Sequence, residues 1–556
     1  MKISVGINGF KEYNELEKRE KLCIESLFRL CKNKSNINVD LYNVCFKEEN
    51  VKYDGFTTLN KLTKKSDELI REYYNKNSRE NDYYSRKEEI DSNTKHLPSV
   101  KEIFDVLAST DCDYFLFLNN DIIISNRLFK ELEDGVECYA ISRFNIREID
   151  SLDEQPVANS YSVHGFDAFL VKKDVWLKIR CNFEDFILGR FYWDTFFATI
   201  FNLFCNCKII NKLPATCFHI DHKGNYNENC IEHLYTDNLF NTNLFVRQIW
   251  FTYVYNIPLK RIKTESSNID TPLPNERDLE KQYFGQFNQK LCFNREFTRC
   301  DITEDKEYDL FIPVHPKDEI KLKYVIEHAA KHLKYRDVFI CSPHKINNKI
   351  SDTRINYIND RDILDIPDTS FIGFRPNWIY QQFLKLSFNL TKKQYYFVLD
   401  SDTILLKDLQ LFENNSPIWY YGGKQNHLPY FLFNKKVFNL DKSLEHTGIG
   451  DVGFFNKNIV QAFLNYTGCK DAKELLYKIG KNTSPFFHFS EFETYANFVN
   501  IYYPGTYVFK QLKQMNEGRD MNLRETPEWT HQGIQELINK YIKTDKQILS
   551  LHSWKI

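Results

Sequence analysis

The stretch QYYFVLDSD, residues 394–402, decides the fold predicted for this chain. Its five central residues, Tyr395 to Leu399, are apolar or aromatic without alternation, which is typical of a strand buried on both faces of a parallel sheet. The run stops at Asp400 and Asp402, so the strand is expected to deliver two carboxylates into the crevice where open α/β sheets bind ligands. Because two carboxylates this close repel each other unless a cation lies between them, we expect Mg²⁺ or Mn²⁺ with a phosphorylated ligand.

The same pattern occurs earlier in the chain, as DYFLFLNND at residues 113–121. A helix-like segment precedes each copy, at 98–109 and at 378–388, and this shared order predicts two domains of one architecture in tandem. When the two copies are aligned, three residue pairs are identical in type: Tyr114 and Tyr395, Leu118 and Leu399, Asp121 and Asp402. The copies differ in that the first has Asn119 where the second has Asp400.

Length and composition indicate a soluble protein of two domains. At 556 residues the chain exceeds one ordinary core, and two domains of about 250 residues each fit the usual size range. A hydrophobic content of 42% with 27% charged residues is typical of a soluble globular protein. The net charge of −2 provides no basic field, so we expect no nucleic-acid partner.

Cysteine usage and apolar patterning favour a cytoplasmic protein. The 14 cysteines are scattered without a CxxC pair, so we interpret them as packing residues of a reduced protein. The longest apolar runs fall short of the roughly 20 residues that span a bilayer, so we expect no transmembrane segment. The N-terminus leads directly into a strand and lacks the apolar core of a signal peptide.

Strand and helix patterns predict an α/β fold in each half. Each half opens with a strand, a helix and a strand, at 3–7, 16–31 and 38–45 and again at 308–314, 320–332 and 336–341. This order is typical of a mostly parallel sheet covered by helices. Residues 256–305 combine Pro, Ser and charge, which predicts a linker between domains at 1–255 and 306–556. A charge-dense stretch at 72–96 is interpreted as a solvated insertion or a lid.

The order of these features resembles the GT-A fold of nucleotide-sugar-dependent glycosyltransferases. The features are the β-α-β opening, the buried strand with Asp-x-Asp, the loop HTGIGD at 446–451, the acidic helix start SEFETYANF at 490–498 and the late His552. Both halves resemble this fold outside the linker. The resemblance implies two tandem Rossmann-like domains that transfer a sugar from a UDP- or GDP-sugar donor to a glycan or glycolipid acceptor, with Mn²⁺ or Mg²⁺ as cofactor.

The resemblance also implies which residues bind the metal and the donor diphosphate. In the second half these are Asp400, Asp402 and His552, although His552 is alternatively a frayed terminal residue. In the first half they are Asp121, with His219 or His222, and Asn119 at the donor site. Asn119 can coordinate through its side-chain oxygen, but it carries no charge to attract an ion. A bound ion would stabilise the charge that builds on the departing diphosphate.

Acidic residues near the start of two helices are candidate general bases for an inverting transfer. In the second half these are Glu491, or Asp451 in the glycine loop, because Ser490 and Glu493 match a capping box in which Glu493 bonds the backbone of Ser490. In the first half Asp194 holds the corresponding place, or else caps its helix.

Two basic residues and two histidines complete the candidate site. Arg375 and Lys385 lie upstream of the acid pair and are predicted to contact the diphosphate, or else to be surface charges. His446 in HTGIGD and His164 in the first half are predicted to contact the acceptor.

Two other functions compete with this interpretation. A haloacid-dehalogenase-type phosphatase also carries Asp-x-Asp after an apolar strand, but on the first strand of its domain, whereas a β-α-β unit precedes Asp400. A non-catalytic binding protein built from decayed domains is opposed by the intact acid pair in the second half, but not in the first. We therefore predict a metal-dependent glycosyltransferase with one transferase per domain, or with a catalytic C-terminal domain and an N-terminal glycan-binding or scaffold module.

Overall fold

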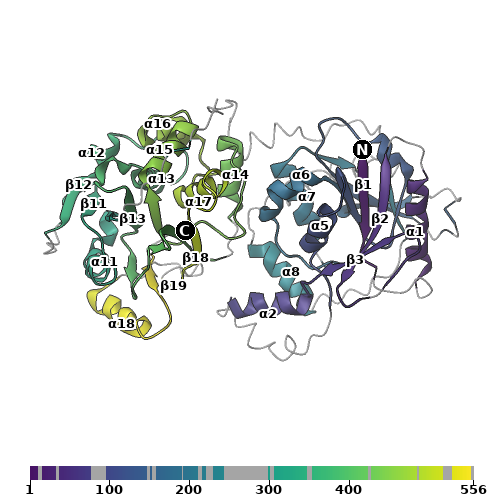
Figure 1. Ribbon diagram of the computed structural model, residues 1–556, viewed down its shortest axis with the longest axis horizontal. Helices are drawn as coiled ribbons and strands as arrows, with labels where there is room; N and C mark the ends of the chain where they lie inside the picture. Colours follow the sequence, from purple (N-terminus) through teal and green to yellow (C-terminus); the bar gives the residue numbers. More distant parts are fainter. Residues whose placement is uncertain are drawn as a thin grey trace. The chain divides into compact units, whose positions relative to one another are not determined.

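The computed structural model describes residues 1–9, 16–32, 37–49, 51–76, 96–146, 149, 151–152, 158–190, 192–210, 216–220, 230–242, 299–300, 306–346, 353–423, 427–484, 487–517 and 529–552. The chain divides into two compact units, Met1–Leu273 and Pro274–Ile556 (Figure 1). The division falls inside the stretch 256–305 that was predicted as a linker, most of which lies outside the described residues. Each unit is described by itself.

The described part of the first unit is built on one mixed sheet of nine strands. The strands are β1 (Lys2–Ile7), β2 (Asn38–Phe46), β3 (Thr57–Leu62), β4 (Tyr114–Leu118), β5 (Ile122–Ile124), β6 (Cys138–Ile146), β7 (Ala158–Lys172), β8 (Cys207–Ile210) and β9 (Cys217–Ile220). Their order is β3-β2-β1-β4-β7-β6-β9-β5, with β8 also paired to β6. The strands from β3 to β4 are parallel, and β7 is antiparallel to β4.

Helices cover both faces of this sheet, with α1 on one face and α5, α6 and α7 on the other (Figure 1). The helical segments are α1 (Lys18–Cys31), α2 (Ser66–Lys76), α5 (Val100–Ala108), η2 (Asn126–Lys130), α6 (Lys173–Ile179), η3 (Arg180–Asn182), α7 (Trp193–Phe204) and α8 (Ile231–Thr242). Successive residues of β4 alternate between these faces. Phe115 and Phe117 contact the ring of Phe104 on α5, whereas Leu116 and Leu118 pack in the cluster that includes α1. The strand is therefore buried on both sides, as its unbroken apolar run predicted.

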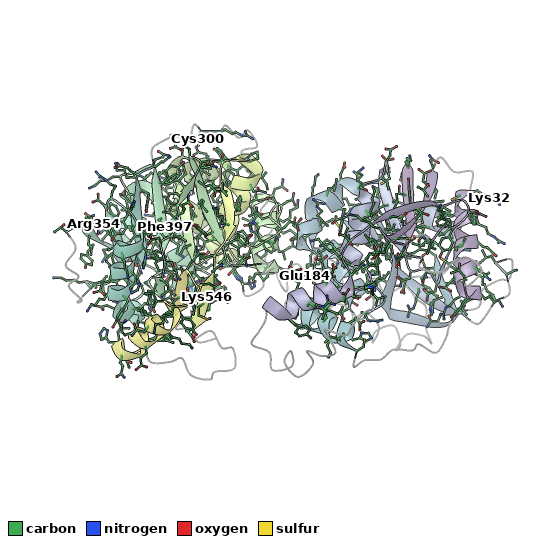
Figure 2. All side chains as sticks on the ribbon, turned by 60° about the horizontal axis from the view of Figure 1, so that its bottom comes forward. Lys32, Glu184, Cys300, Arg354, Phe397 and Lys546 are labelled. Carbon is green, nitrogen blue, oxygen red and sulfur yellow. The ribbon has the colours of Figure 1, made fainter. Side chains whose placement is uncertain are left out.

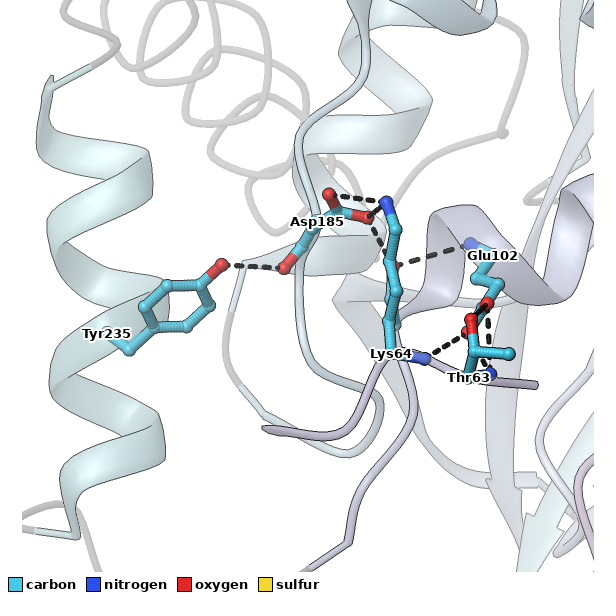
Figure 3. A network of polar contacts seen from close by, with 6 residues as sticks. Thr63, Lys64, Glu102, Asp185 and Tyr235 are labelled. Atoms are coloured by element: carbon cyan, nitrogen blue, oxygen red, sulfur yellow. Dashed lines mark hydrogen bonds and ion pairs between the residues drawn. The ribbon is translucent and has the colours of Figure 1, made fainter. Parts of the chain in front are cut away.

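A polar network joins three elements at one side of the first unit (Figure 3). The Asp185 carboxylate accepts hydrogen bonds from Lys64 Nζ at 2.9 Å and from the Ser99 hydroxyl at 2.8 Å. The carbonyl of Asp185 accepts a hydrogen bond from the Tyr235 hydroxyl of α8 at 3.0 Å. On α5, the Glu102 carboxylate accepts the backbone N–H of Lys64 at 2.9 Å. These bonds hold the chain that enters α2 against α5 and α8.

The described part of the second unit contains a five-stranded sheet and two smaller three-stranded sheets. The strands are β10 (Tyr308–Pro313), β11 (Val338–Ser342), β12 (Ile355–Asn359), β13 (Tyr395–Leu399), β14 (Thr403–Leu405), β15 (Phe412–Glu413), β16 (Ser416–Tyr421), β17 (Val452–Asn456), β18 (Val508–Gln511), β19 (Gln514–Glu517) and β20 (Ile548–Leu551). The orders are β12-β11-β10-β13-β17, β14-β20-β19 and β15-β16-β18. Phe397, the middle residue of β13, lies among the side chains that fill this unit (Figure 2).

The helices of the second unit follow the strands in the α/β alternation that was predicted. They are η4 (Pro316–Asp318), α11 (Glu319–His332), α12 (Asp360–Leu364), α13 (Pro376–Lys385), η5 (Phe388–Leu390), α14 (Leu428–Phe438), α15 (Lys457–Tyr466), α16 (Ala472–Ile479), η6 (Gly480–Asn482), α17 (Glu491–Tyr502) and α18 (His531–Tyr541). Among the helices of the described ranges, none combines the length and the apolar character needed to cross a membrane.

The two units share one strand order. The order β3-β2-β1-β4-β7 of the first unit matches β12-β11-β10-β13-β17 of the second, with three parallel pairs followed by one antiparallel pair in both. The predicted α/β class with mostly parallel strands is therefore confirmed in each unit. The two strands that end at the acids, β4 and β13, were expected in a parallel sheet. Each has one parallel and one antiparallel neighbour.

One expected element differs in detail. The polar stretch predicted as an insertion at 72–96 begins inside α2, because the apolar side chains of Ile70 and Tyr74 are buried at helical spacing. Residues 77–95, the greater part of the predicted insertion, lie outside the described residues.

Candidate functional site

The acid pair of the second unit lies in the short link between two strands. β13 ends at Leu399 and β14 begins at Thr403, so Asp400 and Asp402 fall in a three-residue connection. The backbone N–H of Thr403 donates to the carbonyl of Asp400 at 3.0 Å, which closes this link as a tight turn. Both carboxylates are thereby held at the C-terminal end of the buried strand β13, where the sequence predicted them.

Lys385, at the end of α13, lies between two carboxylates. Its ammonium is 2.7 Å from Asp400 Oδ1 and 2.8 Å from Glu491 Oε1, and it lies 4.4 Å from the centre of the Phe492 ring. The backbone N–H of Glu491 also donates to Gln382 on α13, at 3.1 Å. The structure thus brings together three residues predicted from sequence, Lys385, Asp400 and Glu491, with Lys385 bound to protein carboxylates.

Burial determines the electrostatics of this group. It raises the pKa of Asp400 to about 6, although the Lys385 ammonium works in the opposite direction. Burial also lowers the pKa of Lys385, but the charges of Asp400 and Glu491 outweigh it and leave that pKa above its ordinary value. Lys385 is therefore a fully charged ammonium inside the fold.

His552 reaches the acid pair because β20 pairs with β14. The antiparallel register places Ser550 opposite Thr403, and the N–H of Leu551 donates to the carbonyl of Asp402 at 2.8 Å. His552 Nδ1 then lies 3.5 Å from Asp402 Oδ2. The imidazole is only 5% exposed, so the alternative of a frayed terminal residue is wrong.

Neighbouring backbone and side chains hold this Asp–His pair. Lys321 is completely buried; it donates to the carbonyl of Leu551 at 2.6 Å and to Asp318 at 2.6 Å. The N–H of His552 donates to the carbonyl of Glu517 at 2.9 Å. Burial raises the pKa of Asp402, but the hydrogen bond and charge of His552 outweigh this effect, so the pKa of Asp402 is lowered.

Asp451, a candidate base, lies beside the acid pair. Val452 pairs with Leu399 across the antiparallel strands, so Asp451 is the residue opposite Asp400 in the same register. Its Oδ2 accepts a hydrogen bond from the Ser550 hydroxyl at 3.0 Å. Asp451 has a φ of 55°, a left-handed conformation that costs energy outside glycine and is often found at functional sites.

Glu493 organises the glycine loop and does not complete a capping box. Ser490 caps α17 by accepting the N–H of Glu493. The Glu493 carboxylate, however, accepts the Gly448 N–H at 2.7 Å and the Thr447 hydroxyl at 2.8 Å, instead of the Ser490 N–H. This half of the capping-box prediction is therefore wrong, because the loop residues offer the buried carboxylate closer donors.

Two other predicted residues are placed differently. His446 stacks on Tyr421 with ring centres 3.5 Å apart, and burial lowers its pKa. Arg375 is exposed at the start of α13, where its guanidinium lies 5.1 Å from the Trp378 ring. At 1.5 Å of rise per residue this end of the helix is about 15 Å from Lys385. The predicted contact of Arg375 with a diphosphate stays a prediction.

In the first unit, Asp121 follows β4 as Asp402 follows β13. Ile122 pairs with His219 across β5 and β9, and His219 Nε2 lies 3.4 Å from Asp121 Oδ2. His219, one of the two histidines considered, is therefore the partner of Asp121. The other, His222, lies outside the described residues. The backbone of His164 lies in β7, but its side chain is not among those described.

Asn119 contacts a carboxylate that no sequence pattern indicated. Its Nδ2 donates to Asp167 Oδ1 at 2.8 Å, and Arg143 Nη1 lies 3.0 Å from each oxygen of the same carboxylate. Burial raises the pKa of Asp167, against the effect of the Arg143 charge. Asn119, which was predicted at the donor site, thus forms a hydrogen-bonded group with the Asp167 carboxylate and the Arg143 guanidinium.

Asp194 lies in the first turn of α7 and is not its cap, because Tyr192 holds the N-cap position. Its Oδ2 accepts the N–H of Phe166 at 3.0 Å. Burial raises the pKa of Asp194 to about 6, and the charge of Asp167 acts in the same direction. This contact with the backbone of β7 is similar to that of Glu493 in the second unit, which binds the backbone of the loop before β17.

The second unit fits a divalent cation by the chemistry of its donors. Two ligands of one octahedral ion, at bonds of about 2.1 Å, lie about 3 Å apart, and the Asp402–His552 pair is close to this spacing. Asp400 and Asp451 add negative charge, and Mg²⁺ or Mn²⁺ needs only two or three protein ligands when phosphate and water supply the rest. Within the described ranges, however, no three His, Cys, Asp or Glu side chains already form a closed metal-binding group.

Sequence reasoning missed four residues of these sites: Arg143, Asp167, Lys321 and Ser550. None of them lies within a recognisable motif. The register of β4 with β7 brings Asp167 opposite Asn119, the pairing of β6 with β7 brings Arg143 to Asp167, and the register of β14 with β20 places Ser550. Lys321 lies on α11 and reaches the carbonyl of Leu551 on β20. Only contacts between distant segments could have indicated these residues.

Comparisons with known proteins add a partial family match and remote structural likenesses. A family model described as a family of unknown function (DUF6492) matches residues 316–537, less than half of the chain. No curated protein matches the chain.

Two solved structures are similar at low scores. A mutant of Drosophila β1,4-galactosyltransferase 7, in complex with manganese, UDP-Gal and xylobiose, has 9% identity and a TM-score of 0.23, covering 40% of this chain and 71% of that one. Mouse xyloside xylosyltransferase 1, in its apo form, has 8% identity and a TM-score of 0.26, covering 44% of this chain and 97% of that one. Scores this low define neither the activity nor the ligands of this chain.

Proposed function

We propose that the second unit is a metal-dependent glycosyltransferase centre that uses a nucleotide-sugar donor and a glycan acceptor. The observation that carries this proposal is the buried Asp402–His552 pair beside Asp400, at the C-terminal end of the buried strand β13. The same arrangement of acids and late histidine was the basis of the resemblance to GT-A glycosyltransferases. It gives a cation-binding edge in the part of an α/β sheet where ligands bind.

In this proposal Asp402 and His552 hold Mn²⁺ or Mg²⁺, and Asp400 faces the ion or the donor ribose. When bound, the ion stabilises the negative charge of the departing nucleoside diphosphate. Lys385 keeps Asp400 ionised by providing a permanent charge at 2.7 Å. Because Lys385 is occupied by two carboxylates, its role is to hold the site, and the predicted contact with the diphosphate is not required.

For the general base, the geometry favours Asp451 over Glu491. Glu491 is held by the Lys385 ammonium at 2.8 Å, so this carboxylate already has a charged partner. Asp451 receives a hydrogen bond from the neutral hydroxyl of Ser550 and lies next to the acid pair. An acceptor hydroxyl in front of β17 would give its proton to Asp451 as the sugar is transferred.

A panel of UDP- and GDP-sugars with Mn²⁺ tests this proposal. Donors are first screened by the rise in melting temperature of the full chain, because a ligand selective for the folded state raises apparent stability. Donor hydrolysis and transfer are then measured for the wild type, Asp402→Ala and His552→Ala. Loss of an electrostatic group at the reacting centre should lower the rate about 100-fold or more.

The control is Asp365→Ala, which removes an aspartate that is 85% exposed in the same unit. This variant should retain wild-type turnover. Equal donor hydrolysis by the wild type and Asp402→Ala would favour a non-catalytic binding protein and would contradict the proposal.

For the first unit, the geometry supports the second of the two predicted roles, a glycan-binding or scaffold module. The Asp121–His219 pair resembles the pair in the second unit, but Asn119 replaces Asp400 and Asp167 is bound by Arg143. A bifunctional enzyme would instead require donor turnover to survive Asp402→Ala and to be lost in Asp121→Ala.

A further inference from the structure

We infer that the first unit takes its ligand without a divalent cation, because Arg143 supplies from within the fold the positive charge that the second unit leaves to a bound ion. This inference rests on the proposed function of the second unit for the comparison of the two sites.

The strand registers identify which residues of the two units correspond. Leu118 pairs with Ala168, so Asn119 is opposite Asp167, and the Nδ2 to Oδ1 hydrogen bond of 2.8 Å follows from this register. Leu399 pairs with Val452, so Asp400 is opposite Asp451. Asn119 therefore takes the place of Asp400, and Asp167 takes the place of Asp451.

Arg143 occupies the carboxylate that would otherwise be available to an ion. Its Nη1 is 3.0 Å from both oxygens of Asp167, whose side chain is only 7% exposed. With the Asn119 amide on Oδ1, this carboxylate already has two donors. The Asp121–His219 distance alone does not separate the units, because it is nearly the same as the Asp402–His552 distance.

The two sites differ in formal charge. In the second unit four carboxylates meet one lysine, a formal charge of −3: Asp400, Asp402, Asp451 and Glu491 with Lys385. In the first unit two carboxylates meet one arginine, a formal charge of −1: Asp121 and Asp167 with Arg143. Glu493 and Asp194 add one negative charge to each unit, and Lys321 and Arg19, which act on Asp402 and Asp121, add one positive charge to each, so both totals are unchanged. The difference is the charge of one divalent cation.

The remaining charge also indicates the class of ligand. A site with a formal charge of −1 and no bound cation repels a nucleoside diphosphate. Asn119, Asn120 and Asp121 are all partly exposed. Each asparagine donates one amide N–H to a carboxylate of the fold, Asp167 or Glu20, and the candidate ligand contacts are the other amide groups and the Asp121 carboxylate. Such groups bind the hydroxyls of an uncharged saccharide, which fits the glycan-binding role proposed for this unit.

Electron paramagnetic resonance of Mn²⁺ with the full chain tests this inference, with and without UDP and GDP. The wild type should bind one Mn²⁺, which Asp402→Ala should abolish and Asp121→Ala should leave unchanged. Arg143→Met, which removes the internal cation, should gain a second Mn²⁺ site with affinity at least about tenfold above that of the wild-type first unit. Asn119→Asp adds a carboxylate at the same place and should give the same gain if Arg143→Met does not fold.

Arg127→Met, which removes an exposed arginine of η2, is the matched control and should gain no site. The inference is overturned if the wild type binds two Mn²⁺ and Asp121→Ala loses one, or if neither Arg143→Met nor Asn119→Asp gains a site. If neither Asp402→Ala nor Asp121→Ala removes the Mn²⁺ that the wild type binds, the proposed function of the second unit fails. The gain in Arg143→Met would still support the inference.

Discussion

A single ammonium group joins two buried carboxylates of the second unit. Lys385 is 5% exposed and lies within 2.8 Å of both Asp400 and Glu491. Removal of one partner from a buried ion pair leaves an uncompensated charge, which is far more costly than loss of a surface pair. Lys385 therefore determines both the stability of this group and the ionisation of Asp400.

Lys385→Met should lower the free energy of unfolding by about 3–5 kcal/mol, because two carboxylates then stay buried without a cation. Urea denaturation followed by circular dichroism measures this change. Lys392→Met, at a lysine that is 70% exposed, is the control and should change stability by less than about 0.5 kcal/mol. A loss below about 1 kcal/mol for Lys385→Met would mean that the carboxylates are protonated or hydrated in the native state.

At this scale the sequence indicated residues but not their partners. Asp400, Asp402 and His552 could be predicted because a strand-end acid pair and a late histidine form a recognisable order. Lys385 could be named, but not its two carboxylate partners, because Glu491 lies more than a hundred residues away. Arg143 carried no signal, since an arginine inside a strand pattern is most often a surface charge.

The glycine loop before β17 is the element that positions Asp451. A Cβ on Gly450 would lie 2.5 Å from the carbonyl oxygen of Tyr420, a contact with backbone that cannot rotate away. By contrast, a Cβ on Gly423 would meet nothing within 4 Å, and this glycine has no positive φ. The two positions provide a matched pair of substitutions in neighbouring loops.

Gly450→Ala should displace the loop from β16, lower the free energy of unfolding by about 1–3 kcal/mol and reduce donor turnover more than stability alone explains. Gly423→Ala should leave both unchanged. Urea denaturation and donor hydrolysis at saturating Mn²⁺ are the measurements. Equal behaviour of the two variants would show that the loop adjusts freely and does not hold Asp451 in place.

In the first unit, the network around Asp185 links several elements and affects stability in a pH-dependent way (Figure 3). Burial raises the pKa of Asp185, but the charges of Lys64 and Lys101 and the hydrogen bonds outweigh it, so this pKa is below the ordinary value of 3.8. The unfolded chain then binds a proton more readily than the folded one. The stabilisation is complete above about pH 4 and is lost as the pH falls below the ordinary value.

Asp185→Asn should therefore lower the free energy of unfolding by about 1–2 kcal/mol at neutral pH, a figure reduced because the Lys64 side chain is 43% exposed. The difference from the wild type should shrink below about pH 4. Urea titrations from about pH 3 to pH 7 measure it. Asp174→Asn, at an exposed position of α6, should show no such dependence, and a constant difference for Asp185→Asn would contradict the assignment.

Elements with strong periodicity were predictable, and short strands were not. The strands β1, β4, β10 and β13 are apolar runs that periodicity identifies directly. β14 and β20 are three and four residues long, and their pairing in a small sheet with β19 makes them strands and brings His552 to Asp402. Pairing between distant segments is not visible in local sequence patterns.

The whole molecule consists of two units that share a strand order and differ in charge. Each has its own hydrophobic cluster, which includes Leu116 and Leu118 in the first unit and Phe397 and Leu399 in the second. The internal repeat of DYFLFLNND and QYYFVLDSD predicted this arrangement, because similar strand-end patterns imply the same position in a sheet. The charge difference could not be predicted, since it depends on Arg143 and Lys385 contacting residues remote in sequence.

Because each unit has its own core, destabilising substitutions in different units should act independently. Lys385→Met should shift only one of two calorimetric transitions of the full chain, and Asp185→Asn only the other. In the double variant the two losses should add to within about 0.5 kcal/mol, as expected for sites that share no partner. A single cooperative transition that both substitutions shift, or a coupling energy above about 1 kcal/mol, would mean that the units stabilise each other and fold as one body.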